Sequence, residues 1–212
     1  RATVVLAIDV SRSMAAEDVK PNRLEAAKDA AQQFVNLLPK GFNVSLVAFA
    51  GTASVIVPPT TDRGMVNRAI ENLQLAPATA IGEAIYSSLD ALTLAPADPK
   101  HPDEPAPGSI VVLSDGFSNV GRSSAQAAEV AKKRGYAVHT IAYGTASGYV
   151  VVDGRREPVP FRPGELREVS RLSGGTAFTA GSSAELSKVY ESIARTVGYV
   201  KEDREVTERY VG

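Results

Sequence analysis

The sequence predicts an α/β fold with a doubly wound, mostly parallel six-stranded sheet, helices on both faces and one antiparallel edge strand. Three observations predict it. Short apolar runs rich in β-branched residues alternate with segments of helical periodicity along nearly the whole chain. Most of these runs are continuously apolar, which is typical of parallel strands covered on both faces. The 212 residues are 44% hydrophobic, which is enough to bury one sizeable core.

The first half of the chain contains three expected strands and three expected helices. The strands are residues 3–8, 44–49 and 54–57, and the helices are 23–38, 62–73 and one opened by Thr79. Asn22 and Glu25 form a capping pair for the first helix. The third strand follows a tight reversal and is stopped by Pro58 and Pro59, so we expect it to be the antiparallel edge strand.

The second half continues the same alternation. Its expected strands are residues 109–113, 137–142 and 176–179, and its expected helices are 123–134, 163–172 and 182–198. The segment 95–108 contains five prolines and is expected to be an exposed, mobile loop. Asp153 and Gly154 lie between alternating valines and predict a β-hairpin over residues 149–160.

Composition and charge exclude several classes of function. A formal net charge of −1 gives no general attraction to nucleic acid or to anionic lipid. The absence of cysteine removes disulfides, thiol catalysis and thiolate metal sites. Nowhere do 18 apolar residues follow one another, so no segment of this chain is expected to span a membrane, and the fragment is expected to be soluble.

The chain is expected to form one domain over residues 1–199, followed by a charged, poorly packed tail over residues 200–212. It runs almost at once into a strand, without the features of a signal peptide. We therefore expect it to be an excised piece of a longer protein.

Polar side chains follow two of the predicted buried strands. Asp9 ends the first strand and is followed by Ser11 and Ser13. Asp115 follows the third buried strand. Ligands of open α/β sheets bind beyond the carboxyl ends of the strands, so these side chains are expected to share one crevice. Thr79 begins a helix, where its hydroxyl can either cap the helix or face the same crevice.

These five side chains suit a hard divalent cation. All of them offer oxygen, which Mg²⁺ prefers at roughly 2.0–2.1 Å in an octahedron, and Mn²⁺ and Ca²⁺ are alternatives. Asp9 and Asp115 supply two negative charges, which balance one divalent ion. The hydroxyls donate little charge, so an aspartate or glutamate from a partner protein would complete the shell.

The same residues resemble the metal-ion-dependent adhesion site of von Willebrand factor A domains. Asp9-Val10-Ser11-Arg12-Ser13 matches the D-x-S-x-S signature of that family. The segment 78–85 around Thr79 resembles its threonine segment, and Ser114-Asp115-Gly116 resembles its last acidic segment. The three segments occur in the order of the family, and the resemblance covers about residues 3–199.

This resemblance implies a Rossmann-like fold and a protein-binding role. It also implies that Ser11, Ser13 and Thr79 bind the metal directly. Asp9 and Asp115 would bind it either directly or through water.

A narrower resemblance is to bacterial membrane-anchored A-domain proteins that are associated with MoxR-type AAA+ ATPases, of the aerotolerance-operon kind. It rests on residues 14–22, the reversal at 51–53 and Tyr143-Gly144-Thr145. Members of this group carry transmembrane helices beside the A domain, and the tail at 210–212 resembles the approach to such a helix. The full-length protein is then expected to be anchored in the cell membrane, on a side that the sequence leaves open. It would act with a AAA+ ATPase in assembling or maturing other proteins.

Three functions from different classes are therefore considered. The first is a metal-dependent binding module, which is not an enzyme. The second is a Mg²⁺-dependent hydrolase or phosphotransferase, but enzymes of the haloacid dehalogenase type need a second aspartate where this chain has Ser11. The third is a scaffolding domain that binds through the hairpin at 149–160 or through the tail and does not use the metal.

Other residues near these motifs are interpreted as structural. Glu17 and Asp18 are expected to lie in a solvated loop rather than to tune the metal site. Tyr143, Tyr149 and Phe161 are assigned to ordinary packing near the hairpin.

Overall fold

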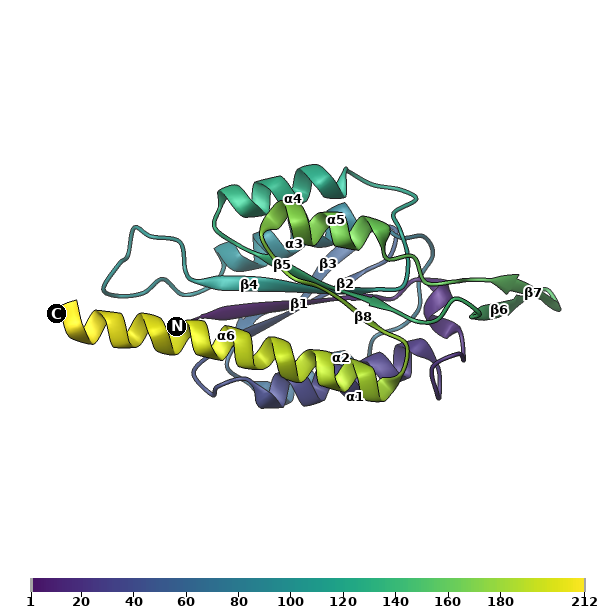
Figure 1. Ribbon diagram of the computed structural model, residues 1–212, viewed down its shortest axis with the longest axis horizontal. Helices are drawn as coiled ribbons and strands as arrows, with labels where there is room; N and C mark the ends of the chain where they lie inside the picture. Colours follow the sequence, from purple (N-terminus) through teal and green to yellow (C-terminus); the bar gives the residue numbers. More distant parts are fainter. Residues whose placement is uncertain (1, 212) are drawn as a thin grey trace.

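The computed structural model describes residues 2–211, with side chains for residues 2–198. Within these residues lies a six-stranded sheet with the order β3-β2-β1-β4-β5-β8 (Figure 1). Its strands are β1 (Thr3–Asp9), β2 (Asn43–Phe49), β3 (Ala53–Thr60), β4 (Gly108–Ser114), β5 (Val138–Tyr143) and β8 (Ala177–Ala180). β3 pairs antiparallel with β2, and all other neighbours are parallel. The predicted fold class is confirmed.

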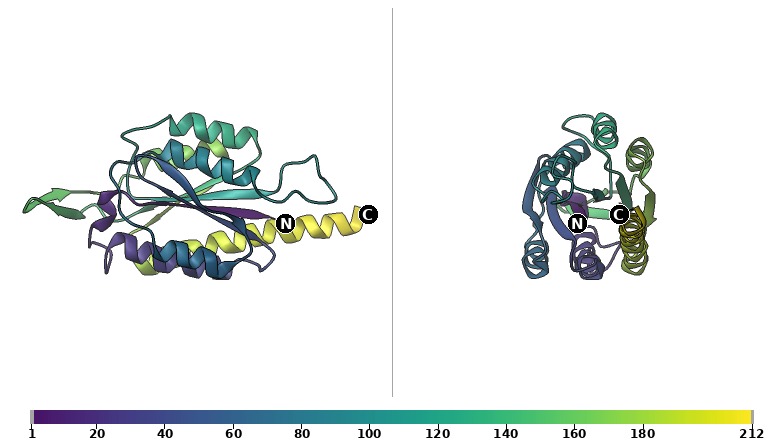
Figure 2. Two further views of the ribbon diagram at one scale, coloured as in Figure 1. Left: turned by 180° about the vertical axis from the view of Figure 1, so that it is seen from behind. Right: turned by 90° about the vertical axis from the view of Figure 1, so that its left-hand side faces the viewer.

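Helices cover both faces of the sheet (Figure 1, Figure 2). One face carries α1 (Arg23–Leu37), α2 (Arg63–Glu71) and α6 (Ser183–Val211), and the other carries α3 (Ile81–Thr93), α4 (Ser124–Lys133) and α5 (Gly164–Ser173). Two apolar cores result, and β1 contributes to both. Leu6 and Ile8 enter the core under α1, whereas Val5 and Ala7 enter the core under α3. Every residue of β1 is buried, which explains its continuously apolar sequence.

The edge strand β3 is longer than expected. The sequence places its end at Pro58 and Pro59, and this prediction is wrong, because the strand continues through both prolines to Thr60. An edge strand tolerates proline, since only one of its sides needs N–H donors. The pairing with β2 also shifts its register between Val44 and Leu46, opposite these prolines.

The last helix is also longer than expected. The sequence predicts its end at about residue 198, but α6 continues to Val211. The expectation that the tail at 200–212 packs poorly concerns side chains that lie outside the described residues. Along the part of the chain that is described, no helix combines the length and the apolar character needed to cross a membrane.

A two-stranded hairpin projects beyond the carboxyl end of the sheet (Figure 1). It consists of β6 (Tyr149–Val152) and β7 (Arg155–Pro158). Asp153 and Gly154 have φ angles of +51° and +78°, the left-handed pair that a tight two-residue hairpin turn requires. The hairpin prediction is therefore confirmed. The 3₁₀ helix η1 (Arg12–Ala15), which leaves β1, lies at the same end.

The packing of α1 against α6 yields a prediction for Phe34. Its side chain is fully buried, and its ring centroid lies 4.9 Å from that of Tyr190. Phe34→Ala is expected to lower the free energy of unfolding by about 3–5 kcal/mol, because it leaves a cavity. Leu37→Ala, on the same helix at a side chain that is 53% exposed, is the control and should cost less than about 1 kcal/mol. Urea denaturation followed by circular dichroism measures both, and equal losses would contradict this packing.

Candidate metal centre

Asp9 ends β1 at the carboxyl edge of the sheet and is completely buried. Its Oδ1 accepts a hydrogen bond of 2.7 Å from the N–H of Ser11, and its Oδ2 accepts one of 2.7 Å from the hydroxyl of Ser114. These two bonds fix the orientation of the carboxylate. Each oxygen has a second lone pair, so Asp9 can still accept a bond from water or bind a cation.

Ser11 and Ser13 lie on the turn that leaves β1. The turn is closed by the N–H of Met14, which donates to the carbonyl of Ser11 at 2.9 Å. It brings the two serine hydroxyls to 3.1 Å from each other. Ser13 also lies near Asp115, since its hydroxyl opposes the rise in the pKa of that carboxylate. The turn thus brings these two serines to the aspartate that follows the neighbouring strand.

Asp115 follows β4, which pairs with β1, and is 2% exposed. Its Oδ2 accepts a hydrogen bond of 2.8 Å from Nη1 of Arg23, the first residue of α1. The Arg23 side chain is fully buried. A buried guanidinium requires carboxylates close by, and Arg23 contacts two of them, Asp115 and Asp18.

Asp18 does not lie in a solvated loop, so that expectation is wrong for this residue, although Glu17 is exposed. The Asp18 side chain is only 8% exposed. Its carboxylate accepts bonds of 2.8 and 2.6 Å from Nε and Nη2 of Arg23, which is a bidentate pair. It also accepts bonds of 3.0 and 2.7 Å from the N–H and hydroxyl of Thr145. These donors offset the burial of the Asp18 carboxylate.

Thr79 precedes α3 and is 9% exposed. Of the two roles considered for it, helix capping is wrong, because the capping position is Ala80. Asn119 fixes the backbone of Thr79 through two hydrogen bonds of 3.0 Å, one in each direction. None of the hydrogen bonds between described residues uses the Thr79 hydroxyl, which leaves this oxygen free to bind a ligand.

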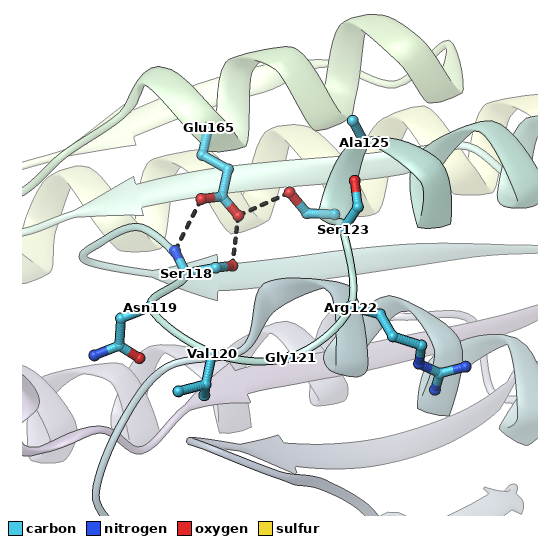
Figure 3. A pocket seen from close by; sticks show the side chains of 9 residues that line it. Ser118, Asn119, Val120, Gly121, Arg122, Ser123, Ala125 and Glu165 are labelled. Carbon is cyan, nitrogen blue, oxygen red and sulfur yellow. Dashed lines mark hydrogen bonds between the residues drawn. The ribbon is translucent and has the colours of Figure 1, made fainter.

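Glu165 of α5 holds the loop that follows Asp115 (Figure 3). Its carboxylate accepts the N–H and hydroxyl of Ser118, at 2.8 and 2.6 Å, and the hydroxyl of Ser124, at 2.7 Å. The Ser118 hydroxyl in turn accepts the N–H of Ile81 at 3.0 Å. The loop lines a cavity of about 360 Å³. Glu165 therefore fixes this loop to the beginning of α3, next to Thr79.

The electrostatics of the site follow from two buried carboxylates that repel each other. Burial, and then the charge of Asp115, raise the pKa of Asp9 to about 7, against the hydrogen bonds that Asp9 accepts. Burial also raises the pKa of Asp115, against hydrogen bonds from Ser13 and Arg23. At Asp18 the effect of burial is outweighed by hydrogen bonds, above all from Arg23, and the pKa is lowered to about 2.

The donor set fits a hard divalent cation. Neighbouring oxygens in an octahedron with Mg²⁺–O bonds of 2.0–2.1 Å lie about 2.9 Å apart, close to the 3.1 Å between the hydroxyls of Ser11 and Ser13. A cation between Asp9 and Asp115 would replace their repulsion by attraction. Across residues 2–198, no three His, Cys, Asp or Glu side chains are grouped to hold a metal ion. Within this part of the chain, the two carboxylates of this edge are therefore not joined by a third such side chain, and the neighbouring polar oxygens are the hydroxyls of Ser11 and Ser13.

Sequence reasoning missed the residues that hold the candidate ligands in place. They are Arg23, Ser114, Ser118, Asn119 and Glu165. The sequence does contain an indication that Arg23 has a structural role. A basic residue in the first turn of a helix interacts unfavourably with the helix dipole, so it needs an acidic partner elsewhere. Glu165 has no such signal, since its partner Ser118 is 47 residues away along the chain.

The raised pKa of Asp9 predicts how the stability of the metal-free protein depends on pH. The folded-state pKa of about 7 exceeds the ordinary value of 3.8, so the folded state binds more protons than the unfolded state between these values. The contribution of Asp9 to the free energy of unfolding should therefore fall by about 2 kcal/mol from pH 5 to pH 7.5. His139, whose pKa is lowered by burial, acts in the opposite direction over this range. The lowered pKa of Asp18 has the opposite effect on the free energy of unfolding, because its stabilising contribution is lost as the pH falls. This loss occurs only below about pH 4.

Urea denaturation in excess chelator at the two pH values measures this loss. Asp9→Asn should remove most of it, since the amide does not titrate. The same pH dependence in both proteins would contradict the assignment to Asp9.

The buried position of Arg23 yields a second prediction. Arg23→Met should lower the free energy of unfolding by about 3–5 kcal/mol, because it leaves Asp18 and Asp115 buried and unpaired. Arg23→Lys should recover only part of this loss, since an ammonium cannot form the bidentate pair. Arg171→Met is the control, as Arg171 is 68% exposed and pairs with an exposed Glu168, and it should cost less than about 1 kcal/mol. An Arg23→Met protein as stable as the parent would refute this account of the network.

Solved structures of other proteins have the same fold. BatB from Bacteroides thetaiotaomicron has a TM-score of 0.82 and 24% identity, over 95% of this chain and 100% of that chain. An aerotolerance-related membrane protein from Bacteroides fragilis has a TM-score of 0.78 and 23% identity, over 92% and 100%. Proximal thread matrix protein 1 from the mussel byssus, solved with a zinc-occupied MIDAS motif, has a TM-score of 0.70 and 20% identity, over 93% and 46%. At these identities the likeness concerns the fold.

Curated relatives are more similar in sequence. A UPF0353 protein from Mycolicibacterium vanbaalenii is 44% identical over 205 residues, and one from Mycobacterium leprae is 42% identical over 205 residues. The matched region covers 94% of this chain, and the chain spans about 61% of the length of these relatives. The family model of the von Willebrand factor type A domain matches residues 4–118, which is more than half of the chain. The chain therefore belongs to the von Willebrand factor type A domain family.

Proposed function

We propose that this chain is a metal-dependent protein-interaction module. It holds one divalent cation, Mg²⁺ or else Mn²⁺ or Ca²⁺, through the oxygens of Asp9, Ser11, Ser13, Thr79 and Asp115. The observation that carries this proposal is the convergence of two repelling carboxylates and two serine hydroxyls at one edge of the sheet. Such a set attracts a hard cation and provides oxygen ligands for it.

The partner is proposed to offer an aspartate or glutamate to the cation. Asp9 and Asp115 together balance one divalent ion, and Arg23 offsets part of the charge of Asp115. The bound cation would therefore still attract an anion. Phe117 and Val120, which are 47% and 45% exposed, lie on the loop after Asp115 and offer apolar contacts to the same partner.

The comparisons support the metal-binding part of this proposal. The mussel protein with the zinc-occupied motif shares the fold of this chain. We further propose that the full-length protein is membrane-anchored through segments outside this chain and acts with a MoxR-type AAA+ ATPase in a protein-assembly system. Support for this part comes from the resemblance to the aerotolerance subgroup, to which the Bacteroides fragilis neighbour belongs by its description as an aerotolerance-related membrane protein.

A Mg²⁺-dependent hydrolase is less well supported by the site. An enzyme of the haloacid dehalogenase type needs a proton-shuttling carboxylate beside the metal, two residues after the first aspartate. That position is Ser11, whose hydroxyl contacts Ser13. The non-enzymatic function therefore accounts for the site better. The scaffolding alternative differs in one respect, because a partner of that kind would still bind in excess chelator.

Calorimetric titration of Mg²⁺ and Mn²⁺ into the chelated protein tests the proposed metal site. The unaltered chain should bind one ion, and Asp115→Ala and Thr79→Val should each weaken binding by at least about 10–100-fold. Asp29→Ala, at an exposed aspartate of α1, and Thr93→Val, at an exposed threonine of α3, are the matched controls and should leave the affinity unchanged. The proposal fails if the unaltered chain binds no divalent ion, or if Asp115→Ala binds it equally well.

A further inference from the structure

The hairpin formed by β6 and β7 has one protected edge and one open edge. Val152 and Arg155 close the tight turn, so this pair, like Val150 and Glu157, exchanges the hydrogen bonds of the ladder. The backbone N–H and C=O groups of Tyr149 and Val151 must then point outward along β6. The outer edge of β7 is blunted, because Pro158 lacks an N–H group and Arg156 carries a charge.

The open edge of β6 is apolar as well as unprotected. Val151 is 66% exposed, Val152 is 46% exposed and Tyr149 is 40% exposed. A two-stranded hairpin is marginally stable in water, so exposed valines on it do little for the fold. Soluble proteins usually protect an edge of this kind, because it invites another strand to pair with it.

This edge begins beside the candidate metal centre. β6 contacts η1, the turn that carries Ser13 (Figure 1). Arg23, which bonds Asp115, also donates to the carbonyl of Val159 at 2.8 Å and so fixes the base of the hairpin. Gly148, the residue before β6, leaves room for this contact, since a Cβ atom there would overlap the Arg23 guanidinium. β6 therefore begins beside the turn that carries Ser13, and its base is tied to the candidate metal centre through Arg23.

The side chains along this edge indicate the chemistry of an occupant. Arg156 is paired across the ladder with Val151, and its guanidinium lies 4.3 Å from the ring centroid of Tyr149. Among the described residues, Arg156 has no carboxylate within ion-pair distance. This face of the hairpin is thus apolar with one unpaired positive charge, which suits apolar and acidic side chains.

Building on the proposed function, we propose that β6 is a strand-addition site. An extended segment of the partner pairs with the open edge of β6 and places its own carboxylate on the metal beside η1. In this segment apolar side chains alternate with polar ones. Acidic residues pair with Arg156, and no proline stands at the positions that pair with β6. Main-chain hydrogen bonds supply affinity in this mode of recognition, and the metal fixes the register.

The test uses labelled synthetic peptides that alternate valine with threonine, carry one glutamate at either end and contain no proline. Fluorescence anisotropy gives their Kd in Mn²⁺ and in excess chelator. Val151→Pro removes an outward N–H without breaking the ladder of the hairpin, and should weaken binding about tenfold. Arg156→Pro removes the corresponding N–H on the β7 edge together with the charge, so it is compared with Arg156→Ala, which removes the charge alone. These two variants should bind the peptides equally, because the β7 edge is not used. N-methylation of alternate peptide residues should have the same effect as Val151→Pro.

The outcomes separate this inference from the proposed function. Strand addition alone would be overturned if Val151→Pro binds the peptides as tightly as the unaltered chain, or if Arg156→Pro binds more weakly than Arg156→Ala by as much as Val151→Pro loses. The absence of binding of either peptide to a chain that does bind Mn²⁺ would overturn it as well. Binding that Val151→Pro abolishes but chelator leaves unchanged would overturn the proposed role of the metal and retain the pairing. Sedimentation that shows a dimer of the unaltered chain, lost in Val151→Pro, would assign the edge to a second copy instead.

Discussion

Repulsion between Asp9 and Asp115 is the constraint around which the carboxyl edge of this domain is organised. The two residues follow adjacent parallel strands, so the topology of the sheet places their carboxylates together in a buried position. Burial of two like charges is unfavourable unless donors or cations surround them. Ser11 and Ser114 donate hydrogen bonds to Asp9, and among the described residues Arg23 is the one cation paired with Asp115. The remaining negative charge is neutralised by a proton on Asp9 at acidic pH, which is why its pKa is raised, and a divalent ion would neutralise it at higher pH.

The surrounding loops are held by polar side chains rather than by apolar packing. Glu165 accepts three hydrogen bonds from Ser118 and Ser124, and Asn119 makes two with the backbone of Thr79. Hydrogen bonds fix the orientation of the groups they join more narrowly than apolar contacts do. A site with a preferred coordination geometry needs groups that are held in this way. The backbone of Thr79 is consequently held in place, and its hydroxyl is not used by these bonds.

The parts of the molecule that the sequence predicts well are those set by local pattern. Continuous apolar runs identify the buried strands, and Asp153-Gly154 identifies the hairpin, because burial on two faces and left-handed φ angles select residue types locally. Element ends are harder, as β3 shows by passing through its prolines at an edge. The candidate ligands follow from where strands end, but Arg23 lies 92 residues from Asp115 in sequence. A contact of that length leaves no periodic signal, so the pairing of Arg23 becomes visible only in the folded chain.

Arg23 also determines how the hairpin and the metal centre can influence each other. One guanidinium bonds Asp115 at the site, Asp18 in the loop and the carbonyl of Val159 at the base of the hairpin. A cation at Asp115 would compete with Arg23 for the same carboxylate. A change in the bond between Arg23 and Asp115 would then alter the bond from Arg23 to the carbonyl of Val159. Linkage is reciprocal, so a partner strand that fixes the hairpin must change the affinity for the metal by the same factor as the metal changes the affinity for the strand. Because the shared group is buried and makes short bonds to all three segments, this coupling needs no large movement of the domain.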